Sequence, residues 1–329
     1  MPMPRCTITH KNTNNLDVIQ VNAGVLSFEI IPELGGKISS LKDLRTGREW
    51  LWKNPRITYK NMPHGSSYIA EADTGGWDEC FPTISACNYP SAPWAGTALQ
   101  DHGELWSQAT SLDIREEGEK AILRSRWRGV ALAYTFERTV TLCYASDSLL
   151  FEYAVSNHAD SPIDFIWSAH PLLAIEPKMQ LRLPPSARFN RTLAIPEGSI
   201  TGDSDLRYPF SLNTGENEID LTSLPEAFVA FAFKIWSNPL SAGWVTLQAE
   251  DGGFHLSWDV AQLPQVAVWM NIGAWAGDGG LPYYNLGLEP CIGAQDSLEE
   301  AVTKHHLFAS IPPQDTHNWQ LKIQLTEKQ

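Results

Sequence analysis

Alternation of apolar and polar residues with a period of two is the feature that most constrains the fold of this chain. Near the C-terminus, Trp319, Leu321, Ile323 and Leu325 alternate with Gln, Lys and Thr residues. Residues 121–127 and 151–155 repeat the pattern. Successive side chains of a strand point to opposite faces, so this spacing predicts half-buried β-strands.

Turn-forming residues separate these runs, so that residues from about 120 to 172 predict four consecutive antiparallel strands. A βαβ rhythm is absent from the sequence, which disfavours a parallel sheet. One short helix is predicted after residue 296, where Asp296 or Ser297 can cap the helix and two glutamates follow in the first turn. The turns between the runs are at 46–47, 116–118, 145–147 and 251–253.

The 329 residues contain no internal repeat, low-complexity tract or linker that would divide them. A hydrophobic fraction of 43% is ordinary for a globular protein. Large β-sandwiches of this length often form one domain. The sequence therefore predicts an all-β protein: one domain over residues 1–329, built as a large antiparallel sandwich with few short helices.

Charge and cysteine usage limit the partners and the compartment. The net charge of −14 disfavours binding to nucleic acid or to anionic membranes. The five cysteines are scattered without CxxC spacing, which favours reduced thiols over disulfides or a zinc site. The N-terminus lacks an apolar signal segment, and no run of 18 apolar residues occurs. We therefore expect a cytoplasmic protein, and its oligomeric state is left open.

Three segments depart from the strand pattern and combine polar groups with aromatic residues. Residues 75–84, GGWDECFPTI, fit a rigid loop that lines a cleft, or equally a surface loop whose acids are solvated. In residues 99–106, His102 precedes a glycine and Trp106 offers a flat apolar face. An indole beside hydrogen-bonding groups suits a sugar ring. For His102 alone, a structural histidine is the competing interpretation.

The third feature is a pair of segments, each of which places one ionisable residue directly after an apolar run. His170 follows FIWSA, Glu289 follows YYNLGL, and a proline comes directly after each. A charged group in such surroundings is unfavourable unless it is paired, and the proline restricts the backbone. Such a pair can supply an acid and a base near neutral pH. The sequence alone does not show that His170 and Glu289 meet in space.

Other chemistries find little support. No remaining histidine has partners at metal-ligand spacing, so no metal site is predicted. Nucleophile elbows, P-loops and dinucleotide-binding motifs are also absent. The glycine pair in residues 33–37, ELGGK, follows one predicted strand and precedes another, which favours a strand connection over a phosphate-binding loop.

Five segments, taken in order, resemble the aldose 1-epimerase family of the galactose mutarotase-like superfamily. They are PELGGKISSLKDLRTGREWLW, GGWDECFPTI, QDHGELWSQ, WSAHPLLAI and YYNLGLEPCIGA, and they span residues 32 to 294. The resemblance implies a β-supersandwich, which agrees with the alternation. It also implies a mutarotase that interconverts the anomers of an aldose by opening and closing its ring, without a cofactor.

Residue roles follow from the same resemblance. Glu289 is expected to take the proton of the anomeric hydroxyl, His170 to protonate the ring oxygen, and His102 to bind the sugar. The phosphosugar branch carries arginines where this chain has Thr74 and Trp106, which favours an unphosphorylated sugar. The Asn-Arg pair of the galactose branch is also absent. Trp77, Asp78, Glu79 and Trp106 are the candidates for the missing sugar contacts.

Two other functions remain open at this stage. The chain could be a non-catalytic carbohydrate-binding protein on the same fold, because a fold does not fix a function. A glycan hydrolase or lyase is the third hypothesis, and a hydrolase would need Asp78 or Glu79 at a defined distance from Glu289.

Overall fold

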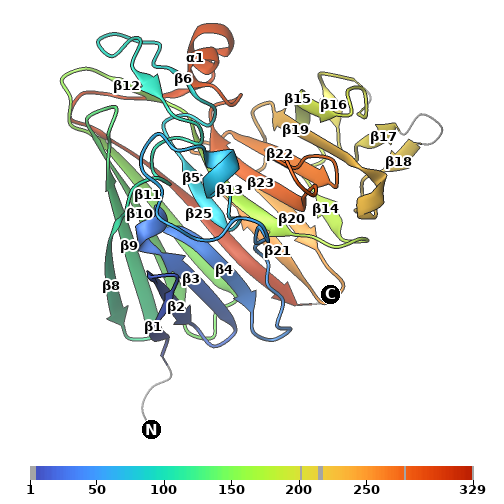
Figure 1. The fold of residues 1–329 in the computed structure, drawn as a ribbon, viewed down its shortest axis with the longest axis horizontal. Helices are drawn as coiled ribbons and strands as arrows, with labels where there is room; N and C mark the ends of the chain where they lie inside the picture. The colour runs from blue at the N-terminus through green and yellow to red at the C-terminus, as the bar shows by residue number, and fades with distance from the viewer. Residues whose placement is uncertain (1–4, 201, 214–217, 278, 328–329) are drawn as a thin grey trace.

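Two large antiparallel β-sheets form the body of the computed structural model, which describes residues 5–200, 202–213, 218–277 and 279–327 (Figure 1). In spatial order, the 11-stranded sheet comprises β1 (Thr7–Thr13), β2 (Leu16–Asn22), β3 (Leu26–Ile31), β4 (Lys37–Asp43), β5 (Trp77–Cys80), β13 (Trp167–Ala174), β23 (Tyr284–Ile292), β22 (Gln265–Ile272), β19 (Phe231–Ser237), β15 (Arg188–Ile195) and β16 (Leu206–Arg207). The 8-stranded sheet comprises β14 (Gln180–Arg182), β20 (Trp244–Gln248), β21 (Gly252–Ser257), β25 (Thr316–Glu327), β11 (Ser148–Asn157), β10 (Tyr134–Cys143), β9 (Lys120–Arg128) and β8 (Ser111–Glu117).

Short elements complete the fold. Three two-stranded sheets pair β6 (Cys87–Asn88) with β7 (Ala98–Leu99), β12 (Ile163–Phe165) with β24 (Ala309–Ile311), and β17 (Ser211–Asn213) with β18 (Glu218–Asp220). The helix α1 (Leu298–Glu300) continues into a π-helical turn, and the Ser297 hydroxyl accepts a hydrogen bond from the Glu300 amide at 3.4 Å. The predicted short helix and its cap are thus confirmed. Among the residues described, no helix is long and apolar enough to cross a membrane.

The expectation of four consecutive antiparallel strands is correct for three of them. β9, β10 and β11 pair in sequence order within the 8-stranded sheet. β13 instead joins the 11-stranded sheet between β5 and β23. Seven of the eight residues of β13 are buried, so the strand lacks the alternation of a half-exposed strand and fits only where both of its faces are covered.

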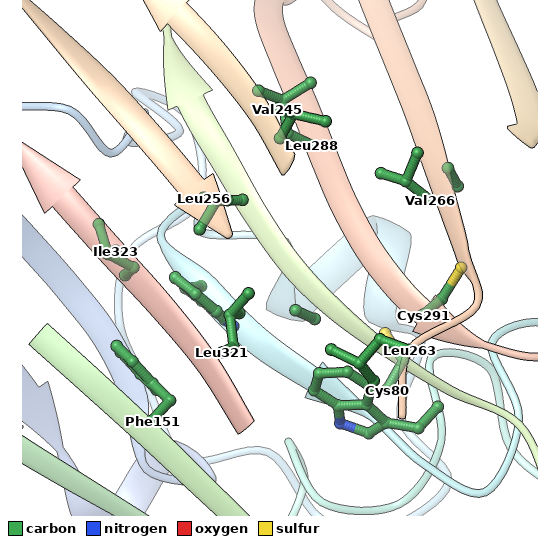
Figure 2. Close-up of a cluster of buried hydrophobic side chains, with 14 of the residues drawn as sticks. Cys80, Phe151, Val245, Leu256, Leu263, Val266, Leu288, Cys291, Leu321 and Ile323 are labelled. Atoms are coloured by element: carbon green, nitrogen blue, oxygen red, sulfur yellow. The ribbon is translucent and has the colours of Figure 1, made fainter. Parts of the chain in front are cut away.

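The inner faces of the two sheets share one apolar core. In Figure 2, Leu288 of β23 and Val266 of β22 lie with Leu256 of β21 and Leu321 of β25 in one cluster. The alternation predicted for β25 is confirmed, since Trp319, Leu321, Ile323 and Leu325 are all buried in this core.

The outer face of β23 carries the polar residues. Leu286 and Leu288 point into the core, while Asn285 and Glu289, displaced by one position, line a pocket on the other face. The long connections before and after β5 and the segment 273–283 supply the other walls of this pocket. The sandwich therefore provides a rigid floor, and connecting segments build the site on top of it.

Candidate functional site

A pocket of about 230 Å³ lies over the middle strands of the 11-stranded sheet. Strands β13, β19, β22 and β23 form its floor. Its lining comprises Tyr68, Ile69, Asp73, Ile84, Ser85, Asp101, His102, His170, Leu172, Leu193, Lys234, Trp269, Trp275, Tyr283, Asn285, Glu289 and Asp296.

Two prolines open the strand ladder at the centre of the floor. β13 and β23 pair at Ser168 with Cys291 and at Leu172 with Gly287, but not in between. Pro171 and Pro290 lie in this gap, and neither has an amide hydrogen to donate. His170 and Glu289 occupy the same gap, each next to one of the prolines.

Glu289 forms part of a triad of charges, in which Glu289 is fully buried and the Asp296 side chain is 31% exposed. Lys234 Nζ lies 3.0 Å from Glu289 Oε2 and 2.9 Å from Asp296 Oδ1. Burial raises the pKa of Glu289, and the Lys234 ammonium opposes that rise. The second oxygen, Oε1, is buried without a hydrogen-bond partner among the described residues. Glu289 thus has one oxygen in an ion pair and one available to accept a proton from a ligand.

Two histidines stand beside this triad. The rings of His102 and His170 lie 5.1 Å apart at 85°. His102 stacks on Tyr68 at 3.8 Å, and its Nδ1 lies 2.9 Å from Asp101 Oδ2. Burial lowers the pKa of His170 well below its ordinary value, and the nearby side chains of His102, Lys234 and Lys37 add to the effect. His170 is therefore neutral in the resting pocket at neutral pH.

The backbone around His102 is fixed by close packing. His102 has a φ of 59° and Gly103 a φ of 70°, both in the left-handed region. A Cβ atom at position 103 would overlap the Phe81 backbone, so only glycine fits there. The His–Gly spacing noted in the sequence thus serves to turn the chain and present the imidazole to the pocket.

The structure brings His102, His170 and Glu289, which lie far apart in the sequence, to one pocket. Their catalytic and binding roles stay predictions. Trp106 and Asp78 lie behind the pocket wall. Trp106 packs edge-on against Tyr68 and donates from Nε1 to the Asp101 carbonyl at 3.0 Å.

Asp78 supports the same wall. It accepts a hydrogen bond from the Tyr68 hydroxyl at 2.7 Å and forms an ion pair with Lys37. Neither Asp78 nor Trp106 is among the residues that line the pocket. The structure therefore gives both a supporting position behind the wall that carries His102.

Trp77 and Glu79 lie in the core instead of a cleft-lining loop, because residues 77–80 form strand β5. Trp77 stacks on Phe151 at 4.9 Å. Glu79 binds Arg138 at 3.0 Å, and burial raises the pKa of Glu79 to about 7. Neither side chain lines the pocket, so a sugar bound there would not contact Trp77 or Glu79.

Sequence reasoning missed several lining residues. Lys234 is a single charge within the apolar strand FAFKIWS, which is itself a signal, because a buried charge requires a partner. Asn285 shares the strand face of Glu289 by period two. Asp296 was considered only as a helix cap, a role that Ser297 fills. Other lining residues that sequence reasoning did not identify include Tyr68, Asp73, Asp101, Trp269, Trp275 and Tyr283.

Metal ligands are not grouped in the part of the chain that the structure describes. No three His, Cys, Asp or Glu side chains there are close enough together to hold a metal ion.

Comparison with known proteins identifies the fold. No protein-family profile and no curated protein sequence matches the chain. Among solved structures, a candidate aldose 1-epimerase from Klebsiella pneumoniae superimposes with a TM-score of 0.72 at 14% identity, over 98% of this chain and 83% of its own. A galactose mutarotase-like protein from Clostridium acetobutylicum has a TM-score of 0.67 at 11% identity, over 98% and 99%. One from Lactobacillus casei has a TM-score of 0.61 at 14% identity, over 94% and 99%. At such low identities the match is one of fold: the chain has the galactose mutarotase-like fold.

Proposed function

We propose that this protein is an aldose 1-epimerase that interconverts the anomers of an unphosphorylated sugar. The observation that carries the proposal is the environment of Glu289. One of its oxygens pairs with Lys234, while the other is unpartnered in a pocket also lined by His102 and His170. A carboxylate held in this way can accept a proton, and the protonated form of a nearby imidazole can donate one.

The proposed reaction needs only proton transfers. Glu289 takes the proton from the anomeric hydroxyl, the bond between C1 and the ring oxygen breaks, and His170 gives a proton to that oxygen. The open-chain aldehyde then rotates about its C1–C2 bond, and the two transfers run in reverse. Each group ends in its starting protonation state, so one pair serves both directions.

The lining also favours a sugar without a phosphate group. Lys234 is the one Lys or Arg among the lining residues that the structure describes, and two carboxylates already hold it. Asp73 and Asp101 add further acidic groups to the lining. A phosphate dianion would meet repulsion here and would lack the guanidinium partner that it prefers.

A sugar-binding protein without catalytic activity is the second candidate, favoured by the aromatic side of the pocket. Trp269 and Trp275 lie 5.6 Å apart, and such indole faces bind sugar rings without any chemistry. The hydrolase hypothesis loses its carboxyl pair, since Asp78 and Glu79 do not line the pocket with Glu289.

The test is polarimetry on freshly dissolved single anomers of free aldoses, with hexose 6-phosphates alongside. We expect at least one unphosphorylated aldose to equilibrate faster than in buffer, and the 6-phosphates to equilibrate at the buffer rate. Faster equilibration of the phosphosugars alone would contradict the substrate assignment.

The pH dependence should reveal the buried histidine. The productive form carries a proton on His170 and none on Glu289, and burial lowers the pKa of His170. Burial also raises the pKa of Glu289, so kcat/KM should fall roughly tenfold per pH unit once the pH exceeds the pKa values of both groups. At pH values below both pKa values, kcat/KM should instead rise with pH, because Glu289 is being ionised. A profile without a decline on its alkaline side would contradict the assignment of His170 as the acid.

Removing the ammonium beside the base should shift the same profile. In Lys234→Met, Glu289 loses the cation that opposes the effect of burial, and His170 loses a cation that lowers its pKa, so the pKa values of both groups rise. The acid limb and the alkaline limb of kcat/KM should then both move to higher pH, while in Lys304→Met, at an exposed lysine of the π-helical turn, neither should move. An unmoved acid limb in Lys234→Met would show that Glu289 is not the titrating base.

A further inference from the structure

The end of the pocket remote from the acid–base pair has a polar character of its own. Asn285, Tyr283 and Trp275 line it, and Asp73 is held beside Tyr283, within electrostatic range of His102. Asn285 and Glu289 are four residues apart on β23, which corresponds to roughly 13 Å along an extended strand. The backbone of Asn285 is therefore well separated from that of Glu289, and the neutral amide of Asn285 does not take part in proton transfer.

Asp73 is held in place although, among the described residues, no Lys or Arg lies within ion-pair distance of its carboxylate. The Asn54 side chain donates to the Asp73 carbonyl at 2.7 Å and to the Tyr283 hydroxyl at 3.0 Å, which fixes Asp73 beside Tyr283. The Asp73 carboxylate accepts one backbone hydrogen bond, from Gly75 at 3.4 Å. Among the described residues no Lys or Arg forms an ion pair with it, although the residue is only 5% exposed.

Close packing fixes the backbone conformation of the turn after Asp73. Gly75 has a φ of 74°, and a Cβ atom there would overlap the Trp52 carbonyl. The glycine pair in this segment thus has a structural purpose, which is to bring Asp73 to the pocket in one conformation.

Asn285 is the second group that lacks a partner. The side chain is 1% exposed, and its Oδ1 is buried without a hydrogen bond among the described residues. Buried amide oxygens are nearly always paired in folded proteins, so an unpaired one in a pocket lining points to a ligand that donates to it.

The Glu289 carboxylate lies close over Gly287, toward the Asn285 end of the strand. A Cβ atom at Gly287 would lie 2.8 Å from Glu289 Oε1 and 3.1 Å from the Trp269 side chain. Glycine inside a strand marks a close approach of another group, which here is the Glu289 carboxylate. A sugar with its anomeric hydroxyl at Glu289 Oε1 would extend from there along the pocket toward Asn285, which also lines it.

We propose that Asp73 and Asn285 form a specificity subsite that binds hydroxyl groups of a neutral sugar at the end remote from its anomeric carbon. The placement of the anomeric carbon rests on the proposed function, whereas the subsite itself rests on the unpaired groups. A carboxylate receives hydrogen bonds from hydroxyls and repels another carboxylate, so the subsite excludes uronic acids. Trp275 and Tyr283 provide apolar faces for the C–H side of the sugar at this end.

The experiment compares the wild type with Asp73→Asn, Asn285→Ala and the control Asp160→Asn, whose side chain is exposed in a surface bend. The probes are D-glucose, D-galactose and the corresponding uronates. Calorimetry gives Kd for each probe, and exchange NMR gives KM and kcat. Circular dichroism checks that each variant is folded, and Asn285→Ala tests the same subsite if Asp73→Asn does not fold.

For the neutral hexose that the wild type binds, we expect Kd and KM to rise about tenfold or more in Asp73→Asn, because hydrogen bonds to a charged group are lost. We expect a rise of about fivefold in Asn285→Ala. The kcat should stay within about threefold in both, since neither group transfers protons. Asp73→Asn should also reduce the preference for hexose over uronate by at least tenfold, and Asp160→Asn should match the wild type.

The two proposals fail in different ways. Unchanged affinities and an unchanged preference for hexose over uronate in Asp73→Asn and Asn285→Ala would overturn the subsite, even with anomeric exchange intact. Weakened hexose binding in these variants, with no exchange in the wild type, would support the subsite and overturn the epimerase. A wild type that binds neither hexose would overturn the subsite as stated.

Discussion

Glu289→Gln is expected to slow enzymatic anomeric exchange by about 10²–10⁴-fold, the range that a positioned acid or base usually contributes. Glutamine keeps the shape of the side chain but cannot accept the proton of the anomeric hydroxyl. It also removes the charge that pairs with Lys234 at 3.0 Å, although Asp296 still holds the ammonium group. The measurement is the exchange rate between the two anomers, followed by NMR under saturating sugar.

Controls separate this effect from a general disturbance of the protein. Glu152→Gln changes an exposed glutamate of β11 in the other sheet, and should leave the exchange rate unchanged. In His170→Asn the exchange rate should fall by a similar factor. In the double variant with Glu289→Gln it should fall little further than in either single variant. Groups that act as one unit are non-additive in this way. A Glu289→Gln protein that retains the wild-type rate would remove Glu289 from the mechanism.

Arg138→Met should give the largest loss of stability, a decrease of about 3–5 kcal/mol in the free energy of unfolding. Arg138 and Glu79 form an ion pair between the sheets with neither side chain exposed. Glu79 also accepts hydrogen bonds from Tyr153 and from the Trp167 indole, each at 3.1 Å. Removing the guanidinium leaves a buried carboxyl group without its cation. Urea unfolding followed by tryptophan fluorescence measures the change.

The double variant Glu79→Met with Arg138→Met distinguishes loss of the charge partner from loss of packing. Two apolar side chains of similar volume leave no buried charge unpaired, so the double variant should be more stable than Arg138→Met alone. If Arg138→Met unfolds within about 1 kcal/mol of the wild type, the ion pair is not what stabilises this part of the core.

Strands with one exposed face could be predicted from the sequence, and strands buried on both faces could not. β9 and β25 alternate along their length, and the structure has them where the alternation places them. β13 is buried throughout, so its sequence carries no period-two signal and does not reveal which sheet it joins. Its neighbours β5 and β23 come from distant parts of the chain, a relation that local pattern cannot encode.

For the site residues too, local sequence did not show which face of a strand a side chain occupies. Asp78 and Glu79 are adjacent on β5, so their side chains point to opposite faces. Asp78 faces the wall behind the pocket and Glu79 faces the core, and the sequence could not say which was which. His102, His170 and Glu289 were identified through their motifs. Lys234 belonged to none of these motifs, although a lone charge in an apolar strand marks a buried partner.

The most direct test of the account is two-dimensional exchange NMR on a 1-¹³C-labelled aldose at anomeric equilibrium, with and without the wild-type protein. The account predicts cross-peaks between the α and β anomeric carbons that grow in proportion to protein concentration and exceed the buffer rate. Sugar resonances that broaden on binding, with no cross-peaks above buffer for any aldose tested, would contradict it and favour a sugar-binding protein without catalysis.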